Sequence, residues 1–144
     1  MKTLYLYTLV MLCTFGAIAQ TTEKSTNEMN REELTKETYA KLFGGEALSA
    51  TGSDPELMNI LQKFIFGEVF HGGVLTDQER ELITIVTLTT QQTLPQLKAH
   101  TAAALNIGIT PVKIREAVYQ CAPFIGFPKT LNAVSTINEV FLFL

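Results

Sequence analysis

Hydrophobic residues recur at the three- and four-residue spacing of an α-helix along most of the chain. The clearest case follows Thr76-Asp77-Gln78-Glu79, which has the form of a capping box at a helix start. After this box, apolar residues cover most of the circumference of the predicted helix, at Leu82, Ile83, Ile85, Val86 and Leu88. A helix that is apolar on most sides is buried among others, so we expect this one to form the centre of the fold.

Two helices are predicted before this central helix. The first runs from about residue 30 to Phe43 and ends at Gly44-Gly45. The second begins after Asp54, with Pro55 in its first turn. Its apolar residues repeat at helical spacing and predict a face in the core: Leu57, Ile60, Leu61, Phe64 and Ile65.

Three more helices are predicted after it. Thr93 and Thr110 each fit a cap residue with a proline in the first turn that follows, Pro95 and Pro111, which is typical of a helix start. Pro123 should kink or end the second of these helices. A last helix follows Pro128, with an inward face predicted at Leu131, Val134, Ile137, Val140 and Phe141. The apolar end from Val140 to Leu144 is expected to be buried against the protein or another subunit. Because no useful alternating pattern predicts a strand, the expected fold is all-α, a single-domain bundle of about six helices.

The first 19 residues differ from the rest in composition. Lys2 precedes an apolar run from Leu4 to Ile18, and Ala17-Ile18-Ala19 has the small-x-small form of a cleavage site. The run is shorter than the roughly 20 residues that a membrane-spanning helix needs. We therefore predict a signal peptide over 1–19 that is cleaved after Ala19, a flexible polar linker over 20–29 and a helical domain over 30–144. This arrangement predicts a periplasmic or secreted protein, without stable membrane insertion after cleavage.

Charge and cysteine content exclude several classes of function. Without Lys2 the chain has 10 basic and 14 acidic residues, a net charge near −4, and no basic run that could follow a phosphate backbone. Nucleic acid is therefore not an expected partner. Cys121 is the only cysteine after the predicted cleavage site, so the mature chain has neither a disulfide framework nor a Cys-x-x-Cys motif.

Glu81 and His100 are the candidate catalytic residues, because each is a polar side chain among apolar or small ones on a predicted helix. A histidine gains and loses a proton near neutral pH and can therefore deliver one to a reacting group. Structural interpretations also remain open. His100 could be a helix histidine bound to a neighbour, and Glu81 could be a first-turn carboxylate favoured by the helix dipole or a salt-bridge partner of Arg80 or Arg115.

Three further residues are candidates for substrate binding: Thr93, Gln96 and Cys121. Thr93, Gln96 and His100 fall at positions i, i+3 and i+7, which lie on one face of a helix. The capping pattern at the helix start also explains Thr93 and Gln96. Cys121 lies on an apolar stripe and also fits a small buried hydrophobic residue.

Several short pieces, taken in order, resemble the carboxymuconolactone decarboxylase family, which includes the alkylhydroperoxidase D-like proteins. The resemblance covers about Ile60 to Phe141. Its pieces are Arg80-Glu81-Leu82, Leu97-x-x-His100, Ala102-Ala103-Ala104-Leu105-Asn106-x-Gly108, Ile114-Arg115-Glu116-Ala117, Gly126-Phe127-Pro128 and Leu131-Asn132-Ala133. Each piece alone is weak, and their order makes the set specific.

The resemblance implies an all-helical subunit that assembles into a homotrimer or homohexamer, with a pocket near the subunit interface. It implies no metal and no organic cofactor. In the peroxidase branch of the family a Glu, a Cys-x-x-Cys pair and a His form the redox site, and the corresponding positions here are Glu81, Thr93, Gln96 and His100. Because both cysteines are absent, we do not expect a thiol-dependent peroxidase.

The decarboxylase branch keeps the His and the Glu without the cysteines. The resemblance therefore implies a cofactor-free lyase that acts on a small carboxylated lactone or related acid, with His100 and Glu81 as acid-base residues. The alternative is a non-catalytic oligomeric binding or scaffold protein of the same fold. A cavity lined by both side chains would favour the lyase, whereas a filled core around His100 would favour the scaffold.

Overall fold

The computed structural model describes residues 30–48 and 53–142, and all the regular structure in these ranges is helical. The all-α prediction is therefore confirmed. The helices are the one over residues 30–43, α2 (Pro55–Gly67), the 3-10 turn η1 (Val69–His71), α3 (Asp77–Gln91), α4 (Leu94–Asn106), α5 (Pro111–Gln120), α6 (Ala122–Ile125) and α7 (Phe127–Phe141).

Two predicted segments lie outside the described residues. They are the signal peptide over 1–19 and the linker over 20–29, and the last two residues of the apolar tail, 143–144, lie outside as well. Among the helices that the structure does describe, none combines the length and the apolar character needed to cross a membrane.

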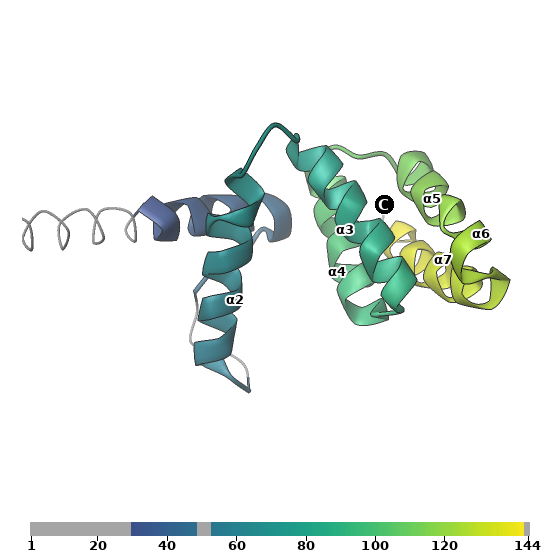
Figure 1. Cartoon of the computed structure of the whole chain (residues 1–144), viewed down its shortest axis with the longest axis horizontal. Helices are drawn as coiled ribbons and strands as arrows, with labels where there is room; N and C mark the ends of the chain where they lie inside the picture. The colour runs from purple at the N-terminus through teal and green to yellow at the C-terminus, as the bar shows by residue number, and fades with distance from the viewer. Residues whose placement is uncertain (1–29, 49–52, 143–144) are drawn as a thin grey trace, which may run out of the picture.

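The central helix of the fold is α3, as the apolar pattern predicts. It packs against α4, α5 and α7, and Figure 1 shows α3 to α7 gathered into one group with α3 and α4 side by side. We call the buried residues inside this group the main core: Ile85, Leu97, Ala104, Ile109, Ile114, Val118, Ala133 and Ile137. Ile114 and Val118, four residues apart on α5, are both fully buried in this core.

Capping hydrogen bonds mark the starts of α3 and α2, which the sequence predicts. Thr76 and Glu79 form the full capping box of α3, since each side chain binds the backbone N–H of the other. The Asp54 carboxylate accepts a hydrogen bond from the Leu57 N–H at 2.9 Å. Thr93 holds the cap position of α4, but its hydroxyl donates to the Leu88 carbonyl at 3.5 Å and makes no cap bond.

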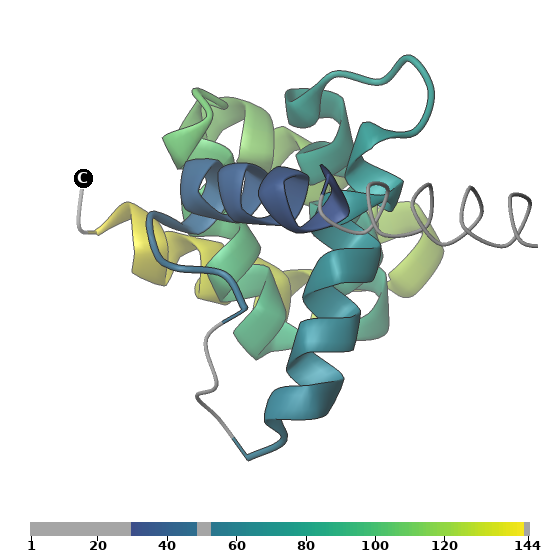
Figure 2. The ribbon, with the colours of Figure 1, turned by 90° about the vertical axis from the view of Figure 1, so that its left-hand side faces the viewer.

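The helix over 30–43 and α2 form a pair beside the main bundle. Figure 2, which views the molecule from this side, shows them running crosswise in front of α3 to α7. The two helices approach closely at Gly67, where a Cβ atom would lie 2.6 Å from the Thr35 hydroxyl. We call the buried apolar residues here the N-terminal cluster: Leu42, Phe66, Phe70 and Ala103. Because Ala103 belongs to α4, this cluster joins the pair to the bundle.

The outer face of α2 corrects a prediction. Leu57, Ile60 and Phe64 are 57%, 61% and 56% exposed, and Leu61 is exposed too, so these residues do not form a core face in a single chain. The buried residues of α2 are instead Gln62, Phe66 and Gly67. The physical reason is that the helix over 30–43 approaches α2 closely at Gly67, near the end of α2, and no described element covers these apolar side chains. Two predicted inward positions near the C-terminus, Leu131 and Leu142, are exposed for the same reason.

Leu42 tests whether the helix over 30–43 is docked on the bundle. Its side chain is fully buried in the N-terminal cluster, so Leu42→Ala should lower the free energy of unfolding by about 2–5 kcal/mol. Urea denaturation followed by circular dichroism measures this loss. Lys36→Ala, on the exposed side of the same helix, should stay within about 0.5 kcal/mol of the wild type. An equally small effect of both substitutions would contradict docking.

Candidate active site

A cavity of about 470 Å³ lies against α3 and α4. Its walls come from four parts of the chain: α2, η1 with the loop that follows it, α3 and α4. Most of the lining is apolar, with a few polar side chains among it. The lining residues are Leu61, Ile65, Phe66, Val69, Phe70, Leu75, Arg80, Glu81, Ile83, Thr84, Leu88, Gln96 and His100. An apolar cavity with a small number of convergent polar groups is the usual form of a small-molecule site.

Glu81 and His100, the two candidate catalytic residues, meet at this cavity. The His100 Nδ1 atom lies 2.9 Å from the Glu81 Oε2 atom, which joins α4 to α3. The Glu81 side chain is fully buried, and that of His100 is 19% exposed. Glu81 is the fifth residue of α3 and so lies beyond the first turn, which corrects the first-turn interpretation. Its partner is His100, and no ion pair joins it to Arg80 or Arg115 in the described part of the chain.

The carboxylate oxygen and the imidazole nitrogen that take no part in this bond differ in their burial. Glu81 Oε1 is buried and has no hydrogen-bond partner among the described residues. His100 Nε2 also has no partner there, but it is not one of the buried unpaired atoms, so it is open to a molecule in the cavity. Burying a carboxylate is costly unless it is paired. At Glu81, the bond to His100 is the only side-chain hydrogen bond among the described residues that offsets this cost.

Arg80 is a further functional candidate at this cavity, in addition to the residues predicted from the sequence. Among the described residues it is the one Lys or Arg side chain in the cavity lining. Its Nη1 donates to the Val69 carbonyl at 3.1 Å and its Nη2 to the Gly72 carbonyl at 2.5 Å, while its Nε is buried and has no partner in the described ranges. The guanidinium also lies 5.7 Å from the centre of the Phe70 ring. Two carbonyls and a ring therefore hold a cation at the cavity wall.

Arg80 shares one face of α3 with two other residues that line the cavity. Arg80, Thr84 and Leu88 are four residues apart on α3, so they share one face, and all three line the cavity together with Glu81. The sequence alone shows this spacing, but it does not show which face of an apolar helix borders an open space. Thr84 was missed for the same reason.

One of the three predicted substrate-binding residues lies at the cavity. Gln96 lines the cavity, one helical turn before His100. Thr93 and Cys121 do not line it, and their contact with a substrate stays a prediction. Cys121 is buried, and its thiol lies 3.5 Å from the Ala117 carbonyl. Burial raises the pKa of the Cys121 thiol above its usual value, so the reactive thiolate is disfavoured.

Two other polar residues considered from the sequence lie away from the cavity. Arg115 contacts Asn138 at 3.2 Å and lies 5.4 Å from the centre of the Phe141 ring. His71 is exposed, and its Nε2 atom lies 2.9 Å from the Thr38 hydroxyl. Neither belongs to the lining.

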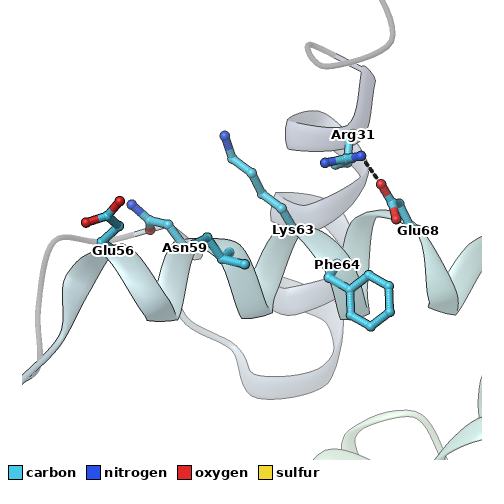
Figure 3. Close-up of a pocket in the computed structure, with 7 residues that line it drawn as sticks. Arg31, Glu56, Asn59, Lys63, Phe64 and Glu68 are labelled. Atoms are coloured by element: carbon cyan, nitrogen blue, oxygen red, sulfur yellow. Dashed lines mark ion pairs between the residues drawn. The ribbon is translucent and has the colours of Figure 1, made fainter.

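A second hollow of about 710 Å³ lies between the helix over 30–43 and α2. Figure 3 shows Arg31, Lys63 and Glu68 around it, with Arg31 paired to Glu68. Lys63 is paired to Glu32, and this hydrogen bond and positive charge lower the pKa of the Glu32 carboxyl. Both cations of the second hollow, Arg31 and Lys63, are thus already paired with carboxylates. The hollow shares no lining residue with the cavity of Glu81 and His100.

The described residues contain no group of three or more His, Cys, Asp or Glu side chains that could hold a metal ion. Three side chains of the cavity wall keep hydrogen-bonding atoms that no described residue uses: the Glu81 carboxylate, the His100 imidazole and the Arg80 guanidinium. The arrangement can therefore bind an anionic group and exchange a proton with it through His100 Nε2.

Comparison with known proteins identifies the class of this fold and site. A model of the carboxymuconolactone decarboxylase family matches residues 55–139, which is more than half of the chain. The chain therefore belongs to the carboxymuconolactone decarboxylase family, and the resemblance seen in the sequence motifs is confirmed.

Two curated relatives are similar over the same region. A 4-carboxymuconolactone decarboxylase of Acinetobacter baylyi is 29% identical over 86 residues, which cover 60% of this chain and 64% of the relative. A nitrosuccinic acid decarboxylase of Metarhizium robertsii is 31% identical over 85 residues, which cover 56% of this chain and 59% of the relative. In both cases the alignment spans less than two thirds of the relative's length.

Proposed function

We propose that the protein is a cofactor-free lyase that removes a carboxyl group from a small carboxylated lactone or related acid. The observation that carries this proposal is the Glu81–His100 pair at the wall of an otherwise largely apolar cavity. Both curated relatives are named as decarboxylases of small acids, which supports the reaction class.

The proposed reaction breaks the bond between the carboxylate carbon and its neighbouring carbon. CO₂ leaves, and the electron pair of this bond stays on the neighbouring carbon, where a conjugated carbonyl group of the substrate can accept it as an enolate. Protonated His100 then gives its Nε2 proton to that carbon and regains a proton from water. Glu81 accepts a hydrogen bond from Nδ1–H and stabilises the positive imidazole before transfer.

Arg80 is proposed to bind a carboxylate of the substrate. Binding an anion in a largely apolar cavity is costly without a positive partner, because the anion loses its hydration. Arg80 is the only Lys or Arg in the described lining, and the Val69 and Gly72 carbonyls use only two of the five N–H donors of its guanidinium. Its bonds to the Val69 and Gly72 carbonyls hold the guanidinium in place before a substrate arrives.

A scaffold without activity is the alternative. A cavity beside His100, rather than a filled core, favours the lyase. Burial of the Cys121 thiol, the one free cysteine in the described residues, favours neither thiol peroxidase nor disulfide chemistry. We also propose export through the signal peptide over 1–19, to the periplasm or the exterior.

Self-association into a homotrimer or homohexamer is a further part of the proposal. Leu57, Ile60 and Phe64 form an exposed apolar group on α2. Such a group differs from the single exposed apolar residues that are normal on a protein surface. A second exposed apolar group lies on α6 and α7, at Phe124 and Phe127. Copies of the chain that cover these faces would remove the apolar side chains from water.

His100→Gln should lower the rate of CO₂ release by about 100-fold or more, because general acid–base catalysis contributes about 10²–10⁴-fold. The assay measures CO₂ from a panel of small carboxylated lactones and related acids. His71→Gln is the matched control, since His71 is the other histidine of the chain and lies outside the cavity; it should keep wild-type activity. Full activity in His100→Gln would remove this residue from the mechanism.

Arg80→Gln should weaken substrate binding by about 10-fold or more, because a hydrogen bond to a charged group contributes about 1.5–3 kcal/mol. The Michaelis constant and isothermal titration with a competing acid measure the loss, and circular dichroism verifies that η1 is still folded. Arg115→Gln removes an equivalent charge outside the cavity and should leave binding unchanged. Equal weakening in both variants would mean that only the net charge matters.

Phe64→Glu should reduce self-association, because it places a charge in the exposed apolar face of α2. Sedimentation velocity of the wild type should give a trimer or hexamer, and the variant should dissociate at micromolar concentration. Glu56→Gln, an exposed polar position on the same helix, should assemble like the wild type. A monomeric wild-type protein would refute the assembly.

A further inference from the structure

The helix over 30–43 lies outside the part of the chain that matches the family, residues 55–139. It is nevertheless fastened to α3 and α4. Asn106 Nδ2 of α4 donates to the Leu42 carbonyl at 2.8 Å, and Lys41 pairs with Asp77 at the start of α3. Leu42 itself is fully buried in the N-terminal cluster. The helix therefore has a fixed position relative to the candidate active site.

Phe43, the last residue of this helix, contacts His100 directly. The centres of the two rings are 5.3 Å apart, and their planes meet at 84°, an edge-to-face arrangement that aromatic rings favour. Phe43 is held in turn by two other rings, with centres 4.9 Å away at Tyr39 and 5.7 Å away at Phe66. Because Phe43 is restrained by its neighbours, it can restrain the imidazole.

The contact of Phe43 and the bond of Glu81 act on different parts of the imidazole. The bond at Nδ1 fixes one point of the ring, and a ring held at one point can still tilt about it. Phe43 packs against the ring itself and opposes this tilt. Phe43 does not line the cavity, so it leaves Nε2 open to a bound molecule.

We infer that Phe43 is a positioning residue for His100, and that the helix over 30–43 is therefore part of the active site. The inference rests on the proposed function, in that His100 Nε2 is the atom that delivers the proton. Proton transfer depends steeply on the placement of the donor, and a displacement of about 1 Å can cost about 100-fold in rate. Phe43 thus serves the reaction without touching the substrate.

The test compares Phe43→Leu with Tyr39→Leu in the full chain. Both variants remove a ring from the same aromatic group, but only Phe43 contacts the imidazole. For Phe43→Leu we expect kcat to fall by about 10- to 100-fold, with KM within about 2-fold of the wild type. Phe43→Tyr restores a ring and should recover kcat to within a few-fold. Tyr39→Leu removes one of the two rings that restrain Phe43 but leaves the ring on His100, so it should lower kcat much less than Phe43→Leu does.

A second readout needs no substrate and is therefore independent of the proposed reaction. Nuclear magnetic resonance of the His100 imidazole, with His71→Gln as the background to leave one histidine, should give one set of signals when Phe43 and Tyr39 are both present. In Phe43→Leu these signals should broaden or divide, and they should do so more strongly than in Tyr39→Leu. The positioning role is overturned if the His100 signals change equally in both variants, or in neither. This result would hold even if none of the tested acids is a substrate. Failure of turnover alone, with the signals changed as expected, would refute only the decarboxylase.

Discussion

The burial of the Glu81 carboxylate is the constraint on which the site depends. A fully buried acid must find a partner within the fold, and His100 provides it from the neighbouring helix. This bond joins α3 to α4 at the cavity, and it leaves the second imidazole nitrogen without a partner among the described residues. A structural pair would be expected to use all its hydrogen-bonding atoms, whereas no described residue binds one oxygen and one nitrogen of this pair.

The other helices serve this pair in different ways. The main core beneath α3 and α4 makes a rigid support, and rigid elements hold reactive groups more accurately than loops do. The segment through η1 closes one side of the cavity, and Arg80 binds its carbonyls. The helix over 30–43 adds Phe43 to the imidazole from outside the region that the family shares.

Much of this arrangement could be predicted from the sequence, because helix starts and breaks are local. Thr76, Asp54 and Pro123 each act through neighbours a few residues away, and each prediction is confirmed. The apolar face of α2 was assigned to the core wrongly, since periodicity indicates that a face avoids water without indicating what covers it. Leu57 and Phe64 show this limit.

The site itself could be predicted only in part. Glu81 and His100 were identifiable as polar residues in apolar helices and as parts of a family motif. The role of Arg80 was not, because the spacing of residues on α3 does not show which face of the helix borders a cavity. Phe43 gave no signal at all, because its partner is distant in the sequence and aromatic residues are common in cores.

The most direct test of the account is the thermal unfolding of the wild type and of Thr84→Phe with a panel of small carboxylic acids and lactones. Thr84 lines the cavity, so a phenyl ring at this position should fill it. An acid at about 100 times its dissociation constant should add about 2.7 kcal/mol to the stability of the wild type. We predict that at least one acid raises the melting temperature of the wild type and leaves that of folded Thr84→Phe unchanged. An equal rise in both proteins, or none in the wild type, would contradict the claim that this cavity is the site.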